Sequence, residues 1–276
     1  MNGAATDKAF VGSIPKLYEQ YMVPMIFEPY ATDLVNRVAA RSLTNVLANV
    51  LEIAAGTGVV TRKLAIKLPE SVAITATDLN QPMLTLAAEI GTKRSIEWRQ
   101  ADAMQLPFDD SMFDVVVCQF GVMFFPDKPK VFAEARRVLK PGGTFIFNVW
   151  DRIEENEFTH TISMALETLF PTDPPRFMQR VPHGYYDLDA IMRDLKMGGF
   201  HALPKFSTIA ARSKAASPRI PATAFCQGTP LRNEIEARGT SLLDKATDVA
   251  AAAITQRFGS GPVAGKIQAH VIVVER

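Results

Sequence analysis

The chain has 276 residues, enough to bury a large core, and its composition is close to the globular average, which argues against a disordered or fibrous protein. Thirty basic and twenty-nine acidic residues nearly cancel, so no overall field favours nucleic acid or an anionic membrane, and a small molecule is the expected partner. Two cysteines are too few for a disulfide framework, and we find neither a secretory signal nor a membrane span of ~20 apolar residues, so a cytoplasmic location is expected.

Two helices are predicted before the first strand. Apolar residues at three- and four-residue spacing predict a helix from Ser13, with Pro15 in its first turn and Pro24 as its end. A second amphipathic helix is predicted over about residues 28–42, whereas residues 1–12 are expected to form a loose end.

The stretch from Asn49 to Thr61 predicts a buried strand, a glycine turn and the start of a helix. Glu52 interrupts the apolar run, and a charge at that place suggests the mouth of a cleft. Gly56 and Gly58 permit a tight turn and a close approach of the backbone to a ligand. The segment therefore predicts the first unit of a nucleotide-binding sheet, with a turn that binds no ligand as the alternative.

Two further strands are each followed by an acid. The strand over residues 72–77 ends at Asp78, about twenty residues beyond the turn, where dinucleotide-binding folds carry an acid for the ribose hydroxyls. A strand over residues 95–98 is followed by Asp102 and Ala103, whose carboxylate and N–H can bond an adenine amine and ring nitrogen. A solvated loop residue is the alternative for Asp78.

The next elements continue the alternation of strands and helices. A buried strand over residues 113–118 brings Gln119 and the residues after it to the same edge of the sheet. A helix over residues 128–139 is predicted to end at the Lys-Pro-Gly-Gly sequence of residues 140–143, before a fifth strand over residues 144–150.

Several of these segments resemble the class I S-adenosylmethionine (SAM)-dependent methyltransferases. Leu-Glu-Ile-Ala-Ala-Gly-Thr-Gly looks like the first motif of that family, with Ala55 where a glycine is usual. Between Gln100 and Asp151, Ala-Asp-Ala-Met-Gln-Leu-Pro-Phe, Asp-Ser-Met-Phe-Asp-Val-Val and Glu-Ala-Arg-Arg-Val-Leu-Lys-Pro-Gly-Gly are similar to the ubiquinone/menaquinone-biosynthesis branch. The resemblance implies an α/β fold, a doubly wound Rossmann-like sheet of seven strands, and SAM as the cofactor. With the spacing of the acids, it predicts cofactor contacts from Tyr21, Glu52, Ala54, Gly56, Gly58, Thr61, Asp78, Leu79, Met83, Asp102, Ala103, Gln119, Phe120 and Val122.

The same resemblance suggests four regions. Residues 1–45 would form a helical lid, residues 46–151 the SAM-binding α/β core, residues 152–186 an inserted, proline-rich substrate cap, and residues 187–276 the completion of the sheet. The last region is predicted to contain strands over residues 205–212 and 268–274. One helix is predicted in the cap, over residues 158–169, and three in the last region, over residues 187–197, 218–225 and 231–258.

Methyl transfer mainly requires binding, alignment and exclusion of water, because the sulfonium already activates the methyl group. His160, His183, Glu157 and Asp151 are candidates for a general base, and Tyr185 or Tyr186 could orient an acceptor. Phe27, Trp150, Phe158 and Tyr185 are candidates for substrate contacts. Core packing or a surface position is the alternative for each. No side-chain cluster has the spacing of a metal site, so no metal is expected.

Two functions from different classes remain open. One is a methyltransferase acting on an O, N or C atom of a small molecule, and the other is a non-catalytic SAM-binding module. A nicotinamide oxidoreductase is disfavoured, because Ala54 precedes the glycine pair and Thr61 stands where the dinucleotide fingerprint requires a third small residue. Neither the acceptor nor the oligomeric state follows from the sequence.

Overall fold

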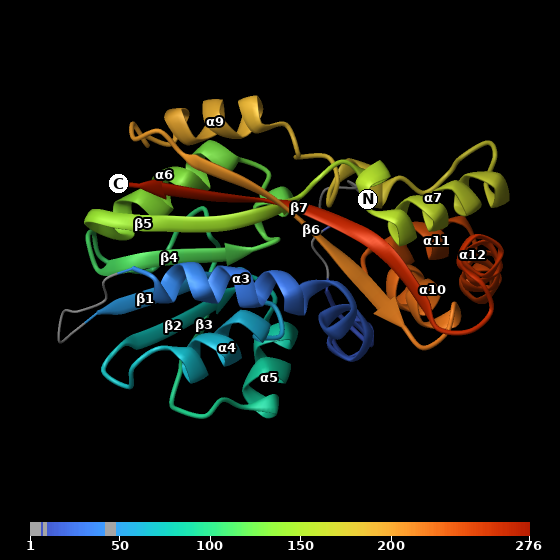
Figure 1. The fold of residues 1–276 in the computed structure, drawn as a ribbon, viewed down its shortest axis with the longest axis horizontal. Coiled ribbons are helices and arrows are strands. Elements are labelled where there is room, and N and C mark those ends of the chain that lie inside the picture. The colour runs from blue at the N-terminus through green and yellow to red at the C-terminus, as the bar shows by residue number, and fades with distance from the viewer. Residues whose placement is uncertain (1–6, 8–9, 42–47) are drawn as a thin grey trace. The chain divides into compact units, whose positions relative to one another are not determined.

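The computed structural model describes residue 7, residues 10–41 and residues 48–276 (Figure 1). Predictions for residues 1–6, 8–9 and 42–47, including the end of the second helix, lie outside the described residues. The chain divides into two compact units. Unit 1 comprises residues 1–28, 150–184 and 209–269, and unit 2 comprises residues 29–149, 185–208 and 270–276.

A seven-stranded sheet confirms the predicted α/β class. Its strands are β1 (Asn49–Ile53), β2 (Ala73–Asp78), β3 (Glu97–Gln100), β4 (Phe113–Gln119), β5 (Leu139–Trp150), β6 (Lys205–Ala215) and β7 (Val263–Glu275). They lie in the order β3-β2-β1-β4-β5-β7-β6, and the neighbours from β3 to β5 are parallel. The order reverses between β1 and β4, and doubly wound sheets bind ligands at such a switch point, at the carboxyl ends of the strands.

Helices of unit 2 cover apolar strands. They are α4 (Val59–Lys67), α5 (Gln81–Ile90), α6 (Lys128–Val138) and α9 (Leu188–Met197), with most of α3 (Glu28–Ala39) and the short 3₁₀ turn η2 (Val122–Phe124). In α6 the side chain of Asp127 caps the helix by accepting from the N–H of Lys130, and Phe132 packs against Phe145 and Phe147 of β5. Figure 1 shows α9 beside α6, where Gly198 leaves room for Phe132.

The predicted helix stop at residues 140–143 is part of a strand instead. α6 ends at Val138, and β5 already begins at Leu139. The pairing with β4 jumps from Phe113 opposite Leu139 to Val115 opposite Thr144, so the Pro-Gly-Gly segment is left as a bulge within β5. Gly142 supplies the positive φ of +77° that such a detour requires.

The expectation that Pro24 ends the first helix is also wrong. The helix α2 (Ile14–Leu17) continues into a π-helix, η1 (Tyr18–Phe27), which contains Pro24 and leads directly into α3. Proline breaks an α-helix through its missing N–H and the clash of its ring with the preceding turn. The wider π turn has a different hydrogen-bond pattern, which allows the chain to remain helical across this residue.

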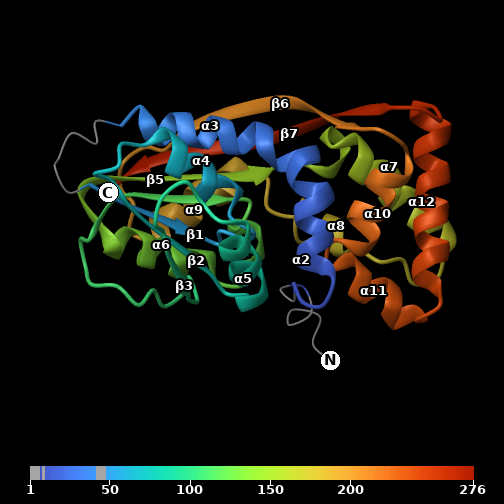
Figure 2. The ribbon, with the colours of Figure 1, turned by 90° about the horizontal axis from the view of Figure 1, so that it is seen from below.

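Unit 1 is mainly helical. Besides α2 and η1 it contains η3 (Ile153–Glu155), α7 (Glu157–Leu169), α8 (Phe177–Arg180), α10 (Arg219–Gln227), α11 (Leu231–Arg238) and α12 (Leu242–Phe258). Figure 2 shows α10, α11 and α12 packed together.

The single helix predicted over residues 231–258 is wrong, because the structure has two helices there, α11 and α12, separated at Gly239. None of the helices in the described part of the chain has the length and hydrophobicity needed to cross a membrane.

Arg137 of α6 anchors the loop that follows β3. Its guanidinium donates to both carboxylate oxygens of Glu134, to Asp110, and to the carbonyl oxygens of Leu106 and Phe108, over distances of 2.7–3.0 Å. Glu134 in turn accepts from the N–H of Leu106 at 2.8 Å. These bonds tie α6 to the loop that begins with the predicted adenine-binding residues.

Replacing Arg137 with methionine should destabilise the protein by about 2 kcal/mol, because carbonyl groups and carboxylates lose charge-assisted partners. The neighbouring variant Arg136→Met is the control, and it should change the free energy of unfolding by less than about 0.5 kcal/mol. Urea denaturation of both variants measures this difference. Equal stability of the two variants would contradict the anchoring role of Arg137.

Candidate functional site

The glycine turn between β1 and α4 has three residues with positive φ. They are Ala54 at 53°, Gly56 at 57° and Gly58 at 83°. In the methyltransferase motif a glycine usually stands at the position of Ala55, but in this structure Ala54 is the alanine that takes the left-handed conformation. A Cβ on Gly58 would lie 2.8 Å from the Trp98 ring, so this glycine is also needed where the turn packs against β3.

Ala54 packs against Gly121 in the loop after β4. A Cβ on Gly121 would lie 2.5 Å from the Ala54 methyl group and 2.7 Å from Cys118 Sγ. Phe120, beside Gly121, also has a positive φ, of 51°. Two non-glycine residues thus hold the left-handed conformation at the ends of β1 and β4, and such conformations often mark functional sites.

Glu52 and Thr61 bond to each other inside unit 2. The Thr61 hydroxyl donates to Glu52 Oε2 at 2.5 Å, and both side chains are buried. Burial raises the pKa of Glu52 to about 8, because desolvation outweighs the hydrogen bond from Thr61 and the charge of Arg62. The protonated, neutral form therefore predominates at pH 7, so Glu52 does not supply a fixed negative charge to the carboxyl edge of the sheet.

Asp78 connects the end of β2 to the glycine turn. Its carboxylate accepts from the N–H of Gly56 and from the N–H of Asn80, both at 2.8 Å, and it is buried. Burial raises its pKa, whereas these hydrogen bonds favour the charged form. A longer bond of 3.4 Å comes from the side-chain amide of Asn80, and the contact of Asp78 with ribose hydroxyls stays a prediction.

The predicted adenine contacts follow β2 and β3, which are adjacent in the sheet. Asp102 Oδ1 accepts from the N–H of Met104 at 2.8 Å, and Ala103 is buried. Met83 is buried at the start of α5, while Leu79 is 45% exposed. The acids and one apolar side chain thus lie at the carboxyl edge, and their roles as adenine and ribose contacts stay predictions.

The loop after β4 brings Gln119, Phe120 and Val122 to the same edge. It also reveals Asn148 of β5, which sequence reasoning missed. Asn148 is fully buried, and its Oδ1 accepts from the N–H of Phe120 at 2.8 Å. A lone polar residue in the apolar run Thr-Phe-Ile-Phe-Asn-Val-Trp was the signal that could have identified it.

Three buried polar atoms near this edge have no hydrogen-bond partner among the described residues. They are Thr57 Oγ1, Gln119 Oε1 and Asn148 Nδ2. Buried polar groups are nearly always paired, so unpaired ones call for a ligand or water. Together with the glycine turn and the two acids, they fit a nucleoside carrying further polar groups.

Apart from Tyr185, the other predicted contacts lie in unit 1. Phe27 stacks on Tyr18 at 5.0 Å and lies 6.1 Å from the Trp150 ring, while Phe158 packs edge-on against Phe258. Phe27, Trp150 and Phe158 are at most 5% exposed, so in unit 1 they belong to the packed interior. Tyr21 and His160 are both half-buried, and their predicted roles stay predictions.

Tyr185 is hydrogen-bonded within unit 2. Its hydroxyl donates to Asp194 Oδ2 at 2.6 Å, and the Lys128 ammonium lies 4.6 Å from its ring centre. Burial and the hydrogen bond to Asp194 raise the pKa of Tyr185, so the phenol stays protonated at neutral pH. It is therefore poorly suited to remove a proton in this conformation.

Burial also shifts the pKa values of one histidine and of both cysteines away from neutral pH. Burial lowers the pKa of His183 to about 4, and its Nδ1 lies 2.8 Å from the carbonyl oxygen of Asp151. Cys118 and Cys226 are free and buried, and burial raises the pKa of each thiol to about 12. None of the described residues forms a cluster of three metal-ligating side chains.

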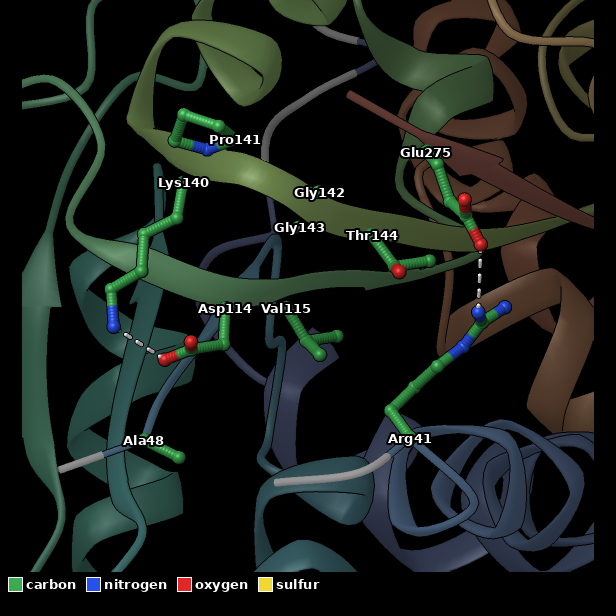
Figure 3. Close-up of a pocket in the computed structure, with 10 residues that line it drawn as sticks. All are labelled: Arg41, Ala48, Asp114, Val115, Lys140, Pro141, Gly142, Gly143, Thr144 and Glu275. Atoms are coloured by element: carbon green, nitrogen blue, oxygen red, sulfur yellow. Dashed lines mark hydrogen bonds and ion pairs between the residues drawn. The ribbon is translucent and has the colours of Figure 1, made fainter. Parts of the chain in front are cut away.

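A pocket of about 400 Å³ lies at the opposite, amino-terminal edge of the parallel strands (Figure 3). Its charged walls are paired with one another, Lys140 with Asp114 at 2.8 Å and Arg41 with Glu275 at 3.2 Å. It contains none of the predicted site residues, so it is separate from the carboxyl edge.

Replacing Gly121 with alanine should destabilise the protein by about 1–3 kcal/mol, because the new methyl group would overlap Ala54 and Cys118. The backbone of Gly121 is in the right-handed region at φ −94°, so the effect is steric alone. Adding Ala54→Gly should restore part of the loss, as a double-mutant cycle in urea would measure. Additive effects of the two changes would contradict the contact.

Stability should fall as pH rises from about 5 to 8, because the folded protein holds a proton on Glu52 that the unfolded chain releases. Glu52→Gln should flatten this dependence by an amount on the order of a few kcal/mol. Urea denaturation at pH 6 and pH 8.5 tests this, with Glu89→Gln, an exposed position, as the control. An unchanged slope in Glu52→Gln would show that Glu52 is ionised in the folded state.

Comparisons with known proteins agree with this geometry. Residues 51–147 match the family model described as a methyltransferase domain. The ubiquinone/menaquinone biosynthesis C-methyltransferase UbiE of Rickettsia felis is 31% identical over 140 residues, which cover 48% of this chain and 56% of that protein. UbiE of Rickettsia bellii is 33% identical over 123 residues, 42% of this chain and 50% of that protein. The chain thus spans about half the length of the curated relatives it matches.

Solved structures share the fold over most of the chain. A putative methyltransferase from Bacillus halodurans has a TM-score of 0.55 at 19% identity, covering 88% of this chain and 98% of that one. Haemonchus contortus phosphoethanolamine N-methyltransferase 2, solved with SAM, has a TM-score of 0.57 at 16% identity, covering 96% and 56%. Residues 51–147 of this chain thus match a methyltransferase domain, and the fold over most of the chain is shared with proteins named as methyltransferases.

Proposed function

We propose that this protein transfers a methyl group from SAM to an O, N or C atom of a small-molecule acceptor. The observation that carries the proposal is the arrangement at the carboxyl edge. Asp78 and Asp102 follow adjacent parallel strands, and Asp78 is bonded to the glycine turn at the point where the strand order reverses. This arrangement suits an adenosine whose ribose and base each meet one acid.

Each of the proposed cofactor residues would bind a different part of SAM. Asp78 would accept from the ribose hydroxyls, Asp102 and Ala103 would hold the adenine, and the turn at Gly56 would let the backbone approach closely. The bound SAM would supply an activated methyl group, so the protein mainly needs to align the acceptor and exclude water. Glu52 and Thr61 would then support the turn from inside.

Neither Tyr185 nor His183 is suited to act as a general base. Tyr185 is held protonated, and the pKa of His183 is lowered by burial. His160 remains the candidate for proton removal. Because the sequence relatives are C-methyltransferases by name, a carbon acceptor is the first to test. An acceptor that is already acidic would need little help from a base.

Two regions are proposed to cover the site. Residues 1–45 would act as a lid and residues 152–186 as a substrate cap. Residues 1–28 and 150–184 belong to unit 1, together with residues 209–269. Two free, buried cysteines support the proposal of a reducing, cytoplasmic setting.

A non-catalytic SAM-binding module is the second candidate. The same glycine turn and acids would serve a protein that binds SAM without transferring its methyl group.

Calorimetric titration with SAM and NAD should give binding of SAM alone. Asp78→Asn should weaken SAM by about tenfold or more, since each hydrogen bond to a charged group is worth about 1.5–3 kcal/mol. Asp109→Asn, in an exposed turn, should leave affinity unchanged. Equal affinity of wild type and Asp78→Asn would remove the ribose assignment.

Turnover decides between the two candidates. Release of S-adenosylhomocysteine should be measured with phenols, quinol precursors and amines, starting with carbon acceptors. Turnover with any of them supports the methyltransferase. Tight SAM binding without turnover across the whole panel would favour the binding module.

A further inference from the structure

The buried polar atoms at the ends of β4 and β5 form a matched pair. Gln119 and Asn148 are partners in the parallel register, so their side chains lie on the same face of the sheet, on strands about 4.8 Å apart. One offers an unpaired acceptor, Gln119 Oε1, and the other an unpaired donor, Asn148 Nδ2. Neither atom bonds the other, so each has capacity for a ligand.

The orientation of the Asn148 amide follows from its surroundings. The N–H of Phe120 can only donate, and it lies 2.8 Å from the atom assigned as Oδ1. A flipped amide would place two donors against each other, so the amide nitrogen is the atom left unpaired. Asn148 therefore does two things: it holds the strained residue Phe120 and presents a buried N–H.

We propose that Gln119 and Asn148 bind the amino-acid end of the cofactor, with Asn148 donating to its carboxylate and Gln119 accepting from its ammonium. The inference rests on the proposed function and adds Asn148 to the site. The placement of the two amides carries it, because they offer one donor and one acceptor to a zwitterion from the same face of the sheet. A neutral pair of amides satisfies both charges without burying a net charge.

The position along the sheet agrees with this assignment. Asp102, at the end of β3, and Asp78, at the end of β2, are proposed for the adenine and the ribose. Continuing in the sheet order past β1, the next strands are β4 and β5. A nucleoside extended across the carboxyl edge from β3 towards β5 brings the group attached to its ribose to Gln119 and Asn148.

A truncated ligand isolates this contact. 5′-Methylthioadenosine keeps the adenosine and the sulfur but lacks the amino-acid group, whereas S-adenosylhomocysteine has it. In calorimetry at pH 7, Asn148→Ala and Asn148→Asp should each weaken S-adenosylhomocysteine about tenfold or more and change 5′-methylthioadenosine by less than about twofold. The Asp variant keeps an acceptor for the N–H of Phe120 but removes the donor.

Two further variants accompany these. Gln119→Leu should likewise weaken the binding of S-adenosylhomocysteine and leave that of 5′-methylthioadenosine nearly unchanged. Asn49→Ala, at the opposite end of β1, is the control and should bind both ligands as the wild type does. Thermal unfolding confirms that each variant is folded.

An equal loss for both ligands in Asn148→Asp would overturn the contact and assign Asn148 to shaping the loop alone. Unchanged affinities would overturn it in favour of a buried water at the amide. Wild type that binds both ligands equally would overturn the contact yet leave the proposed function standing, whereas wild type that binds neither would overturn both.

Discussion

The hydrogen bond from the N–H of Gly56 to Asp78 is the interaction on which the site depends. It joins the turn after β1 to the end of β2 at 2.8 Å, inside the protein. A parallel sheet brings its carboxyl ends together, but the loops there still need to be held in place. Because Asp78, the acid that is proposed to bind the ribose, also accepts a hydrogen bond from the glycine turn, the positions of the turn and of the proposed ribose contact depend on each other.

Steric fit supports that arrangement at the next strand. Ala54 takes a left-handed backbone conformation that costs an alanine roughly 1–2 kcal/mol, and its methyl group occupies the space left by Gly121. Phe120 is held in a similar conformation by Asn148. Backbone strain is therefore present on both sides of the switch point, and contacts with buried neighbours hold Ala54 and Phe120 in their strained conformations.

Electrostatics at this edge differ from what the charges in the sequence suggest. Glu52 is neutral at pH 7 because burial raises its pKa to about 8. Two further acids, Asp78 and Asp102, lie at the ends of β2 and β3. Amides at positions 119 and 148 provide the remaining polarity. This pattern can bind a cofactor with a positive sulfonium and a zwitterionic end without a cluster of fixed charges.

The sequence by itself determined the class of fold, the glycine turn and the acids after two strands, because these depend on local patterns of period, turn chemistry and spacing. It could not show that Ala54 and not Ala55 takes the glycine-like conformation, or that Pro24 lies inside a helix. Burial of Glu52 and the pairing of Gln119 with Asn148 were likewise decided by tertiary structure. Those features arise from contacts between segments far apart in the chain, and no local pattern encodes which side chains end up without a partner.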